Sequence, residues 1–324
     1  MAVLVGGAGV SHSPQLSIPP DGWRAHGDLE QPRLAELGLR PSARTPDDLR
    51  SELGGDLMAA RHEACQRALE ATRDELLALR PDVLVVVGDD QHELFLDDIM
   101  PAVAVYWGTS LEDRPPGAAE YPASMEMAYR YYHGDDTDTY VTDAGLGLHV
   151  VEQLMDAGID VGQFSVQPEG RSLGHAFTFV YRRLLEGLPR LPLVPIMLNT
   201  YFPPNQPSPA RCVTLGRALR AAIESWPQQR RVALIASGGL THPIIDEELD
   251  RRLLDALERQ DDEELARLPV PELVEGTSEI RNWITVGAAM HGLHGKTVDY
   301  VPAYRSTAGS GCGMGFFTWS DGVA

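Results

Sequence analysis

The chain has 324 residues, and its 27 lysines and arginines against 47 aspartates and glutamates give a net charge of −20 at neutral pH. This acidic surplus argues against a nucleic-acid partner, because nucleic acids are bound mainly by basic side chains that neutralise phosphates. Hydrophobic residues make up 43% of the chain and charged residues 23%, which is typical of globular proteins and not of disordered chains.

Membrane, secreted and disulfide-rich proteins are not expected either. The apolar run from Val83 to Val87 is far shorter than the ~20 residues that cross a bilayer. The N-terminus lacks the basic start and long apolar core of a secretory signal. Cys65, Cys212 and Cys312 are odd in number and widely spaced, which predicts neither a disulfide framework nor a thiolate zinc site. We therefore expect a reduced, cytoplasmic protein with no membrane partner.

Short apolar runs in chain order predict buried strands at residues 3–10, 83–87, 103–106, 193–198 and 232–236. They are rich in Val, Ile and Leu and do not alternate with polar residues, which is typical of a sheet covered on both faces. Apolar residues at helical spacing predict helices over 57–79 and 215–226. This alternation indicates an α/β fold, and we expect residues 1–324 to form a single large catalytic domain with a mixed central sheet and helices on both faces.

Two stretches are predicted to lack long regular elements. Residues 19–48 contain prolines and glycines among charges, namely Pro20, Gly22, Gly27, Pro32, Pro41 and Pro46. Residues 201–209 contain four prolines and must be extended or turned. Long loops often cover binding sites, so the stretch at 19–48 is either a lid or a solvated excursion.

Polar residues follow several of the predicted strands. His12, His92 and His242 each come after a strand, and Asn199 and Tyr201 follow another. Open α/β sheets bind their ligands at the carboxyl ends of the strands. One histidine at such a place is more often structural, but three that converge there indicate a functional site as readily as a structural one.

Several common motifs are missing, and the carboxylate of a metal site is ambiguous. The run that begins with Gly7 and Gly9 has His12 where a dinucleotide-binding fingerprint has its third glycine, and there is no P-loop or G-x-S-x-G elbow. Glu279 opens a predicted helical segment at 277–284. The helix dipole alone favours a glutamate there, so spacing does not establish Glu279 as a ligand.

Three motifs resemble, in order, signatures of the class III extradiol ring-cleavage dioxygenases: VSHSP at 10–14, SGGLTH at 237–242 and TSEIRNW at 277–283. That superfamily includes the protocatechuate 4,5-dioxygenase beta subunit and 2,3-dihydroxyphenylpropionate 1,2-dioxygenase. Further similarity lies at 81–87, 172–177 and 211–216, so the resemblance covers most of the chain.

The resemblance implies a non-haem Fe(II) held by two histidines and one glutamate. His12 matches the first ligand and Glu279 the carboxylate. His242 matches a histidine that acts as acid and base beside the substrate. His175 is similar to the family's other active-site histidine, although Gly174 precedes it here, whereas the family usually has a glycine after it.

The second histidine ligand is where this sequence departs from the family. The family usually has Asp-His at that strand end, with a phenylalanine four residues after the histidine. Counting back from Phe95 in the same way reaches Gln91, and His92 comes one residue later. Imidazole is a common ligand for Fe(II) and an amide oxygen is weaker. We therefore expect His92 to be the ligand, with Gln91 as the alternative.

The implied reaction is cleavage of an aromatic ring beside the two hydroxyls of a catechol-type diol, with O₂ as the second reactant. Two histidines and a carboxylate leave positions open on Fe(II) for both reactants, and a neighbouring histidine can carry the phenolic proton. Thr200 and Tyr201 would flank the substrate. The rivals are a zinc-containing or atypical oxygenase or hydrolase on the same scaffold, and a non-catalytic metal- or ligand-binding homologue.

Some features remain open at this level. The glycine-rich residues 306–311 offer backbone N–H groups to a substrate carboxylate or simply form a tight turn. Nothing ranks Arg211, Arg281 and Arg305 as partners of such a carboxylate. The stretch at 19–48 would cover the site as a separate alpha subunit does in two-subunit relatives, with Trp23 as its anchor. The resemblance also favours a homo-oligomer.

Overall fold

The computed structural model describes residues 1–115 and 132–322. Its centre is an eight-stranded mixed sheet with the strand order β6-β3-β7-β2-β8-β1-β10-β9. β7, β2, β8 and β1 are parallel neighbours, whereas β3 and β10 run antiparallel to β7 and β1. The strands are β1 (Val3–Val10), β2 (Val83–Asp89), β3 (Val103–Tyr106), β6 (Gly162–Phe164), β7 (Leu193–Leu198), β8 (Arg231–Ser237), β9 (His294–Tyr304) and β10 (Gly311–Ser320). A separate two-stranded sheet pairs β4 (Ser110–Asp113) with β5 (Asp138–Val141).

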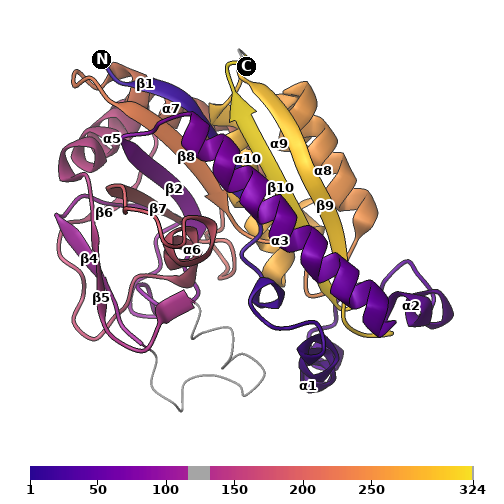
Figure 1. Cartoon of the computed structure of the whole chain (residues 1–324). Coiled ribbons are helices and arrows are strands. Elements are labelled where there is room, and N and C mark those ends of the chain that lie inside the picture. Colours follow the sequence, from indigo (N-terminus) through magenta and orange to yellow (C-terminus); the bar gives the residue numbers. More distant parts are fainter. Residues whose placement is uncertain (116–131, 323–324) are drawn as a thin grey trace.

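Helices cover both faces of this sheet (Figure 1). One face packs against α3 (Gly55–Ala78) and α6 (His175–Phe179), which continues into a π-helical turn, η2 (Val180–Leu184). The other face packs against α5 (Ala144–Asp156), α7 (Pro209–Ser225), α8 (Glu247–Arg259), α9 (Asp262–Ala266) and α10 (Ile280–Ala289). Every residue of β2 and β7 is buried, as unalternating apolar strands require. The α/β fold, all five predicted strands and both predicted helices are therefore confirmed.

For residues 19–48 the structure corrects the expectation that no long regular element forms there. It forms a fifteen-residue helix, α1 (Gly22–Glu36), despite Pro32 inside it, and the start of α2 (Pro46–Glu52). The Trp23 side chain is completely buried, and its ring N–H donates to the carbonyls of Gln15 and Ile18. Packing of this residue outweighs the backbone hydrogen bond that proline cannot make.

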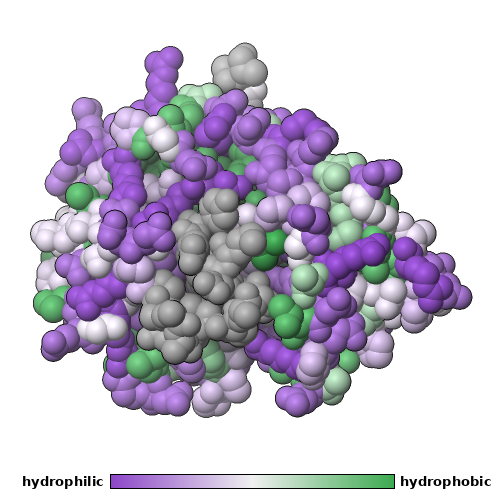
Figure 2. All heavy atoms as spheres, turned by 60° about the horizontal axis from the view of Figure 1, so that its bottom comes forward, coloured by the Kyte–Doolittle hydropathy of each residue, from purple (hydrophilic) through white to green (hydrophobic). Residues whose placement is uncertain are grey.

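The parallel strands bring their carboxyl ends to one end of the molecule, next to α1 and α2, while both termini lie at the other end (Figure 1). That surface, brought forward in Figure 2, is mostly hydrophilic with separate hydrophobic spots. Short helical turns contribute here: η1 (Pro14–Leu16), η3 (Val270–Glu272) and η4 (Glu275–Glu279). Residues 201–208 contain no helix or strand, as predicted. Within the described parts of the chain, no helix is long and apolar enough to cross a membrane.

Candidate metal centre and active site

Most of the predicted site residues meet in one pocket at the carboxyl ends of the parallel strands. The pocket has a volume of about 200 Å³. Its floor and walls include side chains that follow β1, β2, β7 and β8, together with the first residue of α6 and the last residue of η4: His12, Gln91, Tyr201, His242, His175 and Glu279. Thr200 is buried nearby but does not line the pocket.

Glu279 is the central carboxylate of this group. It is buried, and its Oε2 lies 3.1 Å from His12 Nε2 and accepts the backbone N–H of Gly239 at 2.6 Å. Its Oε1 lies 3.3 Å from His242 Nε2 and accepts the hydroxyl of Tyr201. Burial alone would raise the pKa of Glu279, but His242 and His12 hold that pKa well below its usual range. The structure thus brings His12, Tyr201 and His242 to one carboxylate, although these residues lie far apart in the sequence.

His12 presents an unshared nitrogen to this carboxylate. The hydroxyl of Ser237 donates to the carbonyl of Ala176 at 2.6 Å, so its oxygen accepts the Nδ1 proton of His12 at 3.1 Å. When the His12 ring is neutral, this network assigns the remaining lone pair to Nε2. The His12 ring is buried, and within the described part of the chain Nε2 has no hydrogen-bond partner. A lone pair that faces a carboxylate oxygen leaves a place for a cation or a proton.

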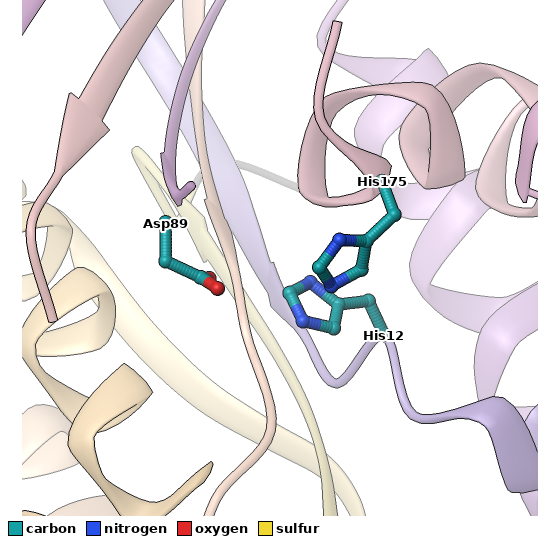
Figure 3. A group of neighbouring side chains, drawn as sticks. All are labelled: His12, Asp89 and His175. Carbon is teal, nitrogen blue, oxygen red and sulfur yellow. The ribbon is translucent and has the colours of Figure 1, made fainter. Parts of the chain in front are cut away.

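A second carboxylate, Asp89 at the end of β2, joins the group. One ligand atom each of His12, Asp89 and His175 lie within 4.8 Å of one another, and all three side chains are buried. Figure 3 shows the two rings side by side with the Asp89 carboxylate directed towards them. Burial and the nearby Glu279 raise the pKa of Asp89 to about 6. The amide of Gln91 donates to Asp89 at 3.0 Å and to Glu279 at 3.3 Å, which links the two carboxylates.

His175 is oriented by a buried carboxylate, Glu93. The Glu93 side chain accepts the backbone N–H of His175 at 3.0 Å, its Nδ1 proton, and the backbone N–H of Gln91 at 2.7 Å. A Cβ on residue 174 would lie 3.0 Å from Glu93 Oε2, so Gly174 leaves room for this approach. Burial acts to lower the pKa of His175, but Glu93 outweighs it and raises that pKa to about 9.

His242 is held in a narrow slot. Its Nδ1 donates to the carbonyl of Leu240 at 2.8 Å, which turns Nε2 towards Glu279. A Cβ added to Gly239 would lie 2.5 Å from the His242 ring, and one added to Gly276 would lie 2.1 Å from it. Although burial acts to lower the pKa of His242, Glu279 raises it well above its usual value.

The structure does not bring His92 to this group. Its ring stacks on Phe202 with the ring centroids 3.9 Å apart, and its Nε2 lies 3.8 Å from Asp97. His92 has a positive φ of 68°, and it is absent from the residues that line the pocket. Asp90 accepts the backbone N–H groups of Leu94 and Phe95, so its carboxylate stabilises the loop that follows β2. Of the two alternatives, Gln91 is the residue that lies at the carboxylates.

Other sequence-level candidates have structural partners. Residues 306–310 lie in the turn between β9 and β10, and Gly311 is the first residue of β10; the Ser306 and Ser310 hydroxyls are 2.7 Å apart. Arg305 lines the pocket, but its guanidinium binds Glu30 of α1 through two hydrogen bonds and Gln15 through a third. Arg281 donates to backbone carbonyls, including that of Pro207 at 2.8 Å.

Asp89 and Glu93 are the site residues that the sequence analysis missed. Asp89 ends a predicted strand, and a carboxylate at a strand end is the signal that could have identified it. Glu93 carries no such signal, because its role depends on contact with His175, which lies 82 residues away.

The fold and this site define a class of protein. The family model of the catalytic LigB subunit of aromatic ring-opening dioxygenases matches residues 51–315, and the chain belongs to this family.

Two individual relatives are also named as dioxygenases. The chain is 35% identical over 124 residues to a gallate dioxygenase of Pseudomonas putida, a match that covers 35% of each chain. It is 26% identical over 176 residues to the 2,3-dihydroxyphenylpropionate/2,3-dihydroxicinnamic acid 1,2-dioxygenase of Escherichia coli, which covers 54% of this chain and 48% of the relative. These matches therefore span between a third and a half of the relatives' length.

Proposed function

We propose that the chain is an extradiol dioxygenase that uses Fe(II) and O₂ to open the ring of a catechol-type diol beside its hydroxyls. The observation that carries this proposal is the buried group of His12, Asp89, His175 and Glu279 in a pocket at the strand ends. Membership of the ring-opening family supports it, and so do the names of both relatives.

The residues present fit a divalent metal ion. The buried, unpartnered Nε2 of His12 lies 3.1 Å from Glu279 Oε2. That separation suits two adjacent ligands of one ion, which at metal–ligand distances of about 2.1 Å stand about 3 Å apart. We propose His12, Glu279 and Asp89 as the ligands. Asp89 then takes the part that the sequence analysis gave to His92, with the Gln91 amide donating to both carboxylates.

Several residues in and around the pocket would have a task in the reaction. When bound, Fe(II) supplies the electron transfer between diol and oxygen that the two reactants do not undergo directly. With Glu279 bound to the metal and no longer raising the pKa of His242, His242 would take the second phenolic proton at Nε2, because its Nδ1 is fixed on a backbone carbonyl. His175, held by Glu93, would also carry a proton. Tyr201 would contact the ring, with Thr200 behind it.

Anaerobic purification followed by metal analysis and a ring-fission assay tests this function. Iron-loaded protein should convert at least one member of a panel of catechols to a yellow product with uptake of O₂. Glu279→Gln should lose both iron and turnover, whereas His92→Ala should keep both. Failure of the iron-loaded protein to consume O₂ with every diol of the panel would contradict the proposal.

A second candidate, a metal- or ligand-binding protein without oxygenase activity, is favoured by one observation. Gln91 stands where the family usually has its second histidine ligand, and an amide is the weaker ligand. The same experiment separates the two, because this candidate binds a diol or a metal such as zinc without turnover. The cytoplasmic location and homo-oligomeric state expected from the sequence stay predictions.

A further inference from the structure

A second cavity, of about 400 Å³, adjoins the site pocket. Both are lined by Leu37, His242, Pro243 and Glu275. The second cavity therefore begins at the histidine proposed to act on the substrate and extends away from the metal ligands. A molecule bound beside His242 has room to continue into it.

Aliphatic side chains form about half of the walls of this cavity. They come from the segment that follows α1, from the residues before and at the start of α8, and from the η3–η4 connection: Leu39, Pro41, Ile244, Ile245, Leu249 and Val274. Val274 is 42% exposed, which leaves a large aliphatic side chain uncovered at the cavity. Contact with an apolar group would remove this surface from water, which is favourable.

The polar groups of the cavity are already paired within the protein. Asp246 accepts the backbone N–H groups of the first turn of α8. Thr241 donates its hydroxyl to Asp250 at 2.9 Å, and Arg40 at the rim pairs with Glu272 at 3.2 Å. Groups that are already paired gain little from a new polar partner. The cavity thus offers an incoming molecule mainly its apolar surface.

The charged groups near the junction of the two cavities also favour an apolar ligand. The buried guanidinium of Arg305 is bound by the Glu30 carboxylate, and Arg33 lies 3.4 Å from Glu275. Both arginines that line the site pocket among the described residues are therefore neutralised by a glutamate. A substituent that carries a carboxylate would have to displace one of these glutamates, whereas an apolar substituent would not.

We propose that this cavity binds an apolar substituent of the aromatic substrate, an alkyl chain or a second hydrocarbon ring attached to the diol. The inference rests on the proposed function, because it places the diol itself in the site pocket, beside His242. It narrows the substrate class from any catechol to catechols that carry an uncharged hydrophobic group.

The test measures the affinity of iron-loaded protein, without oxygen, for catechol and for its methyl, propyl and hexyl derivatives substituted para to one hydroxyl. Each methylene buried should tighten binding about three- to fourfold until the cavity is full. Turnover under oxygen is measured in parallel for the same series.

A matched pair of variants locates the effect. Val274→Phe narrows the cavity and should weaken binding of hexylcatechol at least tenfold more than binding of catechol. Val270→Phe makes the same change at another half-exposed valine, on η3, that lines neither cavity, and should behave as the unaltered protein.

The outcomes are separable from those of the proposed function. Affinity that rises with chain length and falls in Val274→Phe supports the inference even if no diol is turned over, in which case the oxygenase proposal fails alone. Equal affinity for catechol and hexylcatechol, no measurable binding of either, or equal effects of the two variants would overturn the inference, whatever the turnover.

Discussion

The buried pair of Glu93 and His175 predicts a specific dependence of stability on pH. His175 has its pKa raised from 6.5 to about 9, and Glu93 has its pKa lowered from 4.5 to about 2, because each holds the charged form of the other in a buried place. The stabilisation from His175 is fully present below pH 6.5 and is lost as the pH rises through 9. That from Glu93 is present above pH 4.5 and is lost as the pH falls through 2. The pair therefore stabilises the fold most between pH 4.5 and 6.5.

The magnitude follows from the shift of His175. A rise of the pKa from 6.5 to about 9 corresponds to about 3 kcal/mol, at about 1.4 kcal/mol for each pH unit. The shift of Glu93 reports the same contact and is not added to it. Glu93→Gln keeps the shape and an acceptor oxygen but removes the charge, so it should remove most of this pH-dependent contribution.

Urea unfolding of metal-free protein at about pH 6 and about pH 10 measures this effect. The unaltered protein should exceed Glu93→Gln in free energy of unfolding at the lower pH, and the excess should shrink by about 3 kcal/mol at the higher pH. Groups that titrate in both proteins cancel in the comparison. An excess of the same size at both values would refute the reasoning, because the variant would then act through shape and not through charge.

Three further changes probe the metal ligands, the His242 slot and the anchor of α1. His12→Ala should lose nearly all bound iron in metal analysis, whereas His92→Ala should keep it, because His12 turns a free nitrogen towards Glu279 and His92 stacks on Phe202. Gly276→Ala should lower kcat about a hundredfold, because its Cβ would lie 2.1 Å from the His242 ring and displace it. Trp23→Ala should lower the free energy of unfolding by about 3–5 kcal/mol in urea, because it empties a completely buried site.

Each of these three predictions would be contradicted by a particular result. Unchanged iron in His12→Ala, together with loss of iron in His92→Ala, would show that the ligand is His92, in the loop after β2. Normal kcat in Gly276→Ala, with the fold verified by circular dichroism, would show that His242 does not need its present position. Unfolding of Trp23→Ala at the same urea concentration as the unaltered protein would mean that α1 is not anchored there.

Five strands of the central sheet (β1, β2, β3, β7 and β8) and the helices α3 and α7 could be predicted from the sequence because their signals are local. Unalternating runs of Val, Ile and Leu predict strands buried on both faces, and β2 and β7 are buried throughout. The motif around His12 predicted a residue at the strand-end site, because the direction of parallel strands determines which ends share an edge. The local sequence did not predict α1, because the burial of Trp23 does not follow from the pattern of its neighbouring residues.

Only the tertiary structure decided which of the two neighbouring side chains, Gln91 or His92, enters the site. Gln91 turns inward and His92 outward because Glu93 binds the backbone of Gln91 and His92 takes a positive φ, neither of which the order of residues reveals. Asp89 gained its place for the same reason, since its carboxylate lies near His12 only once β1 and β2 flank β8 in the sheet. Local composition determines which segments become strands, whereas the direction of a side chain in the loop after a strand depends on contacts with distant parts of the chain.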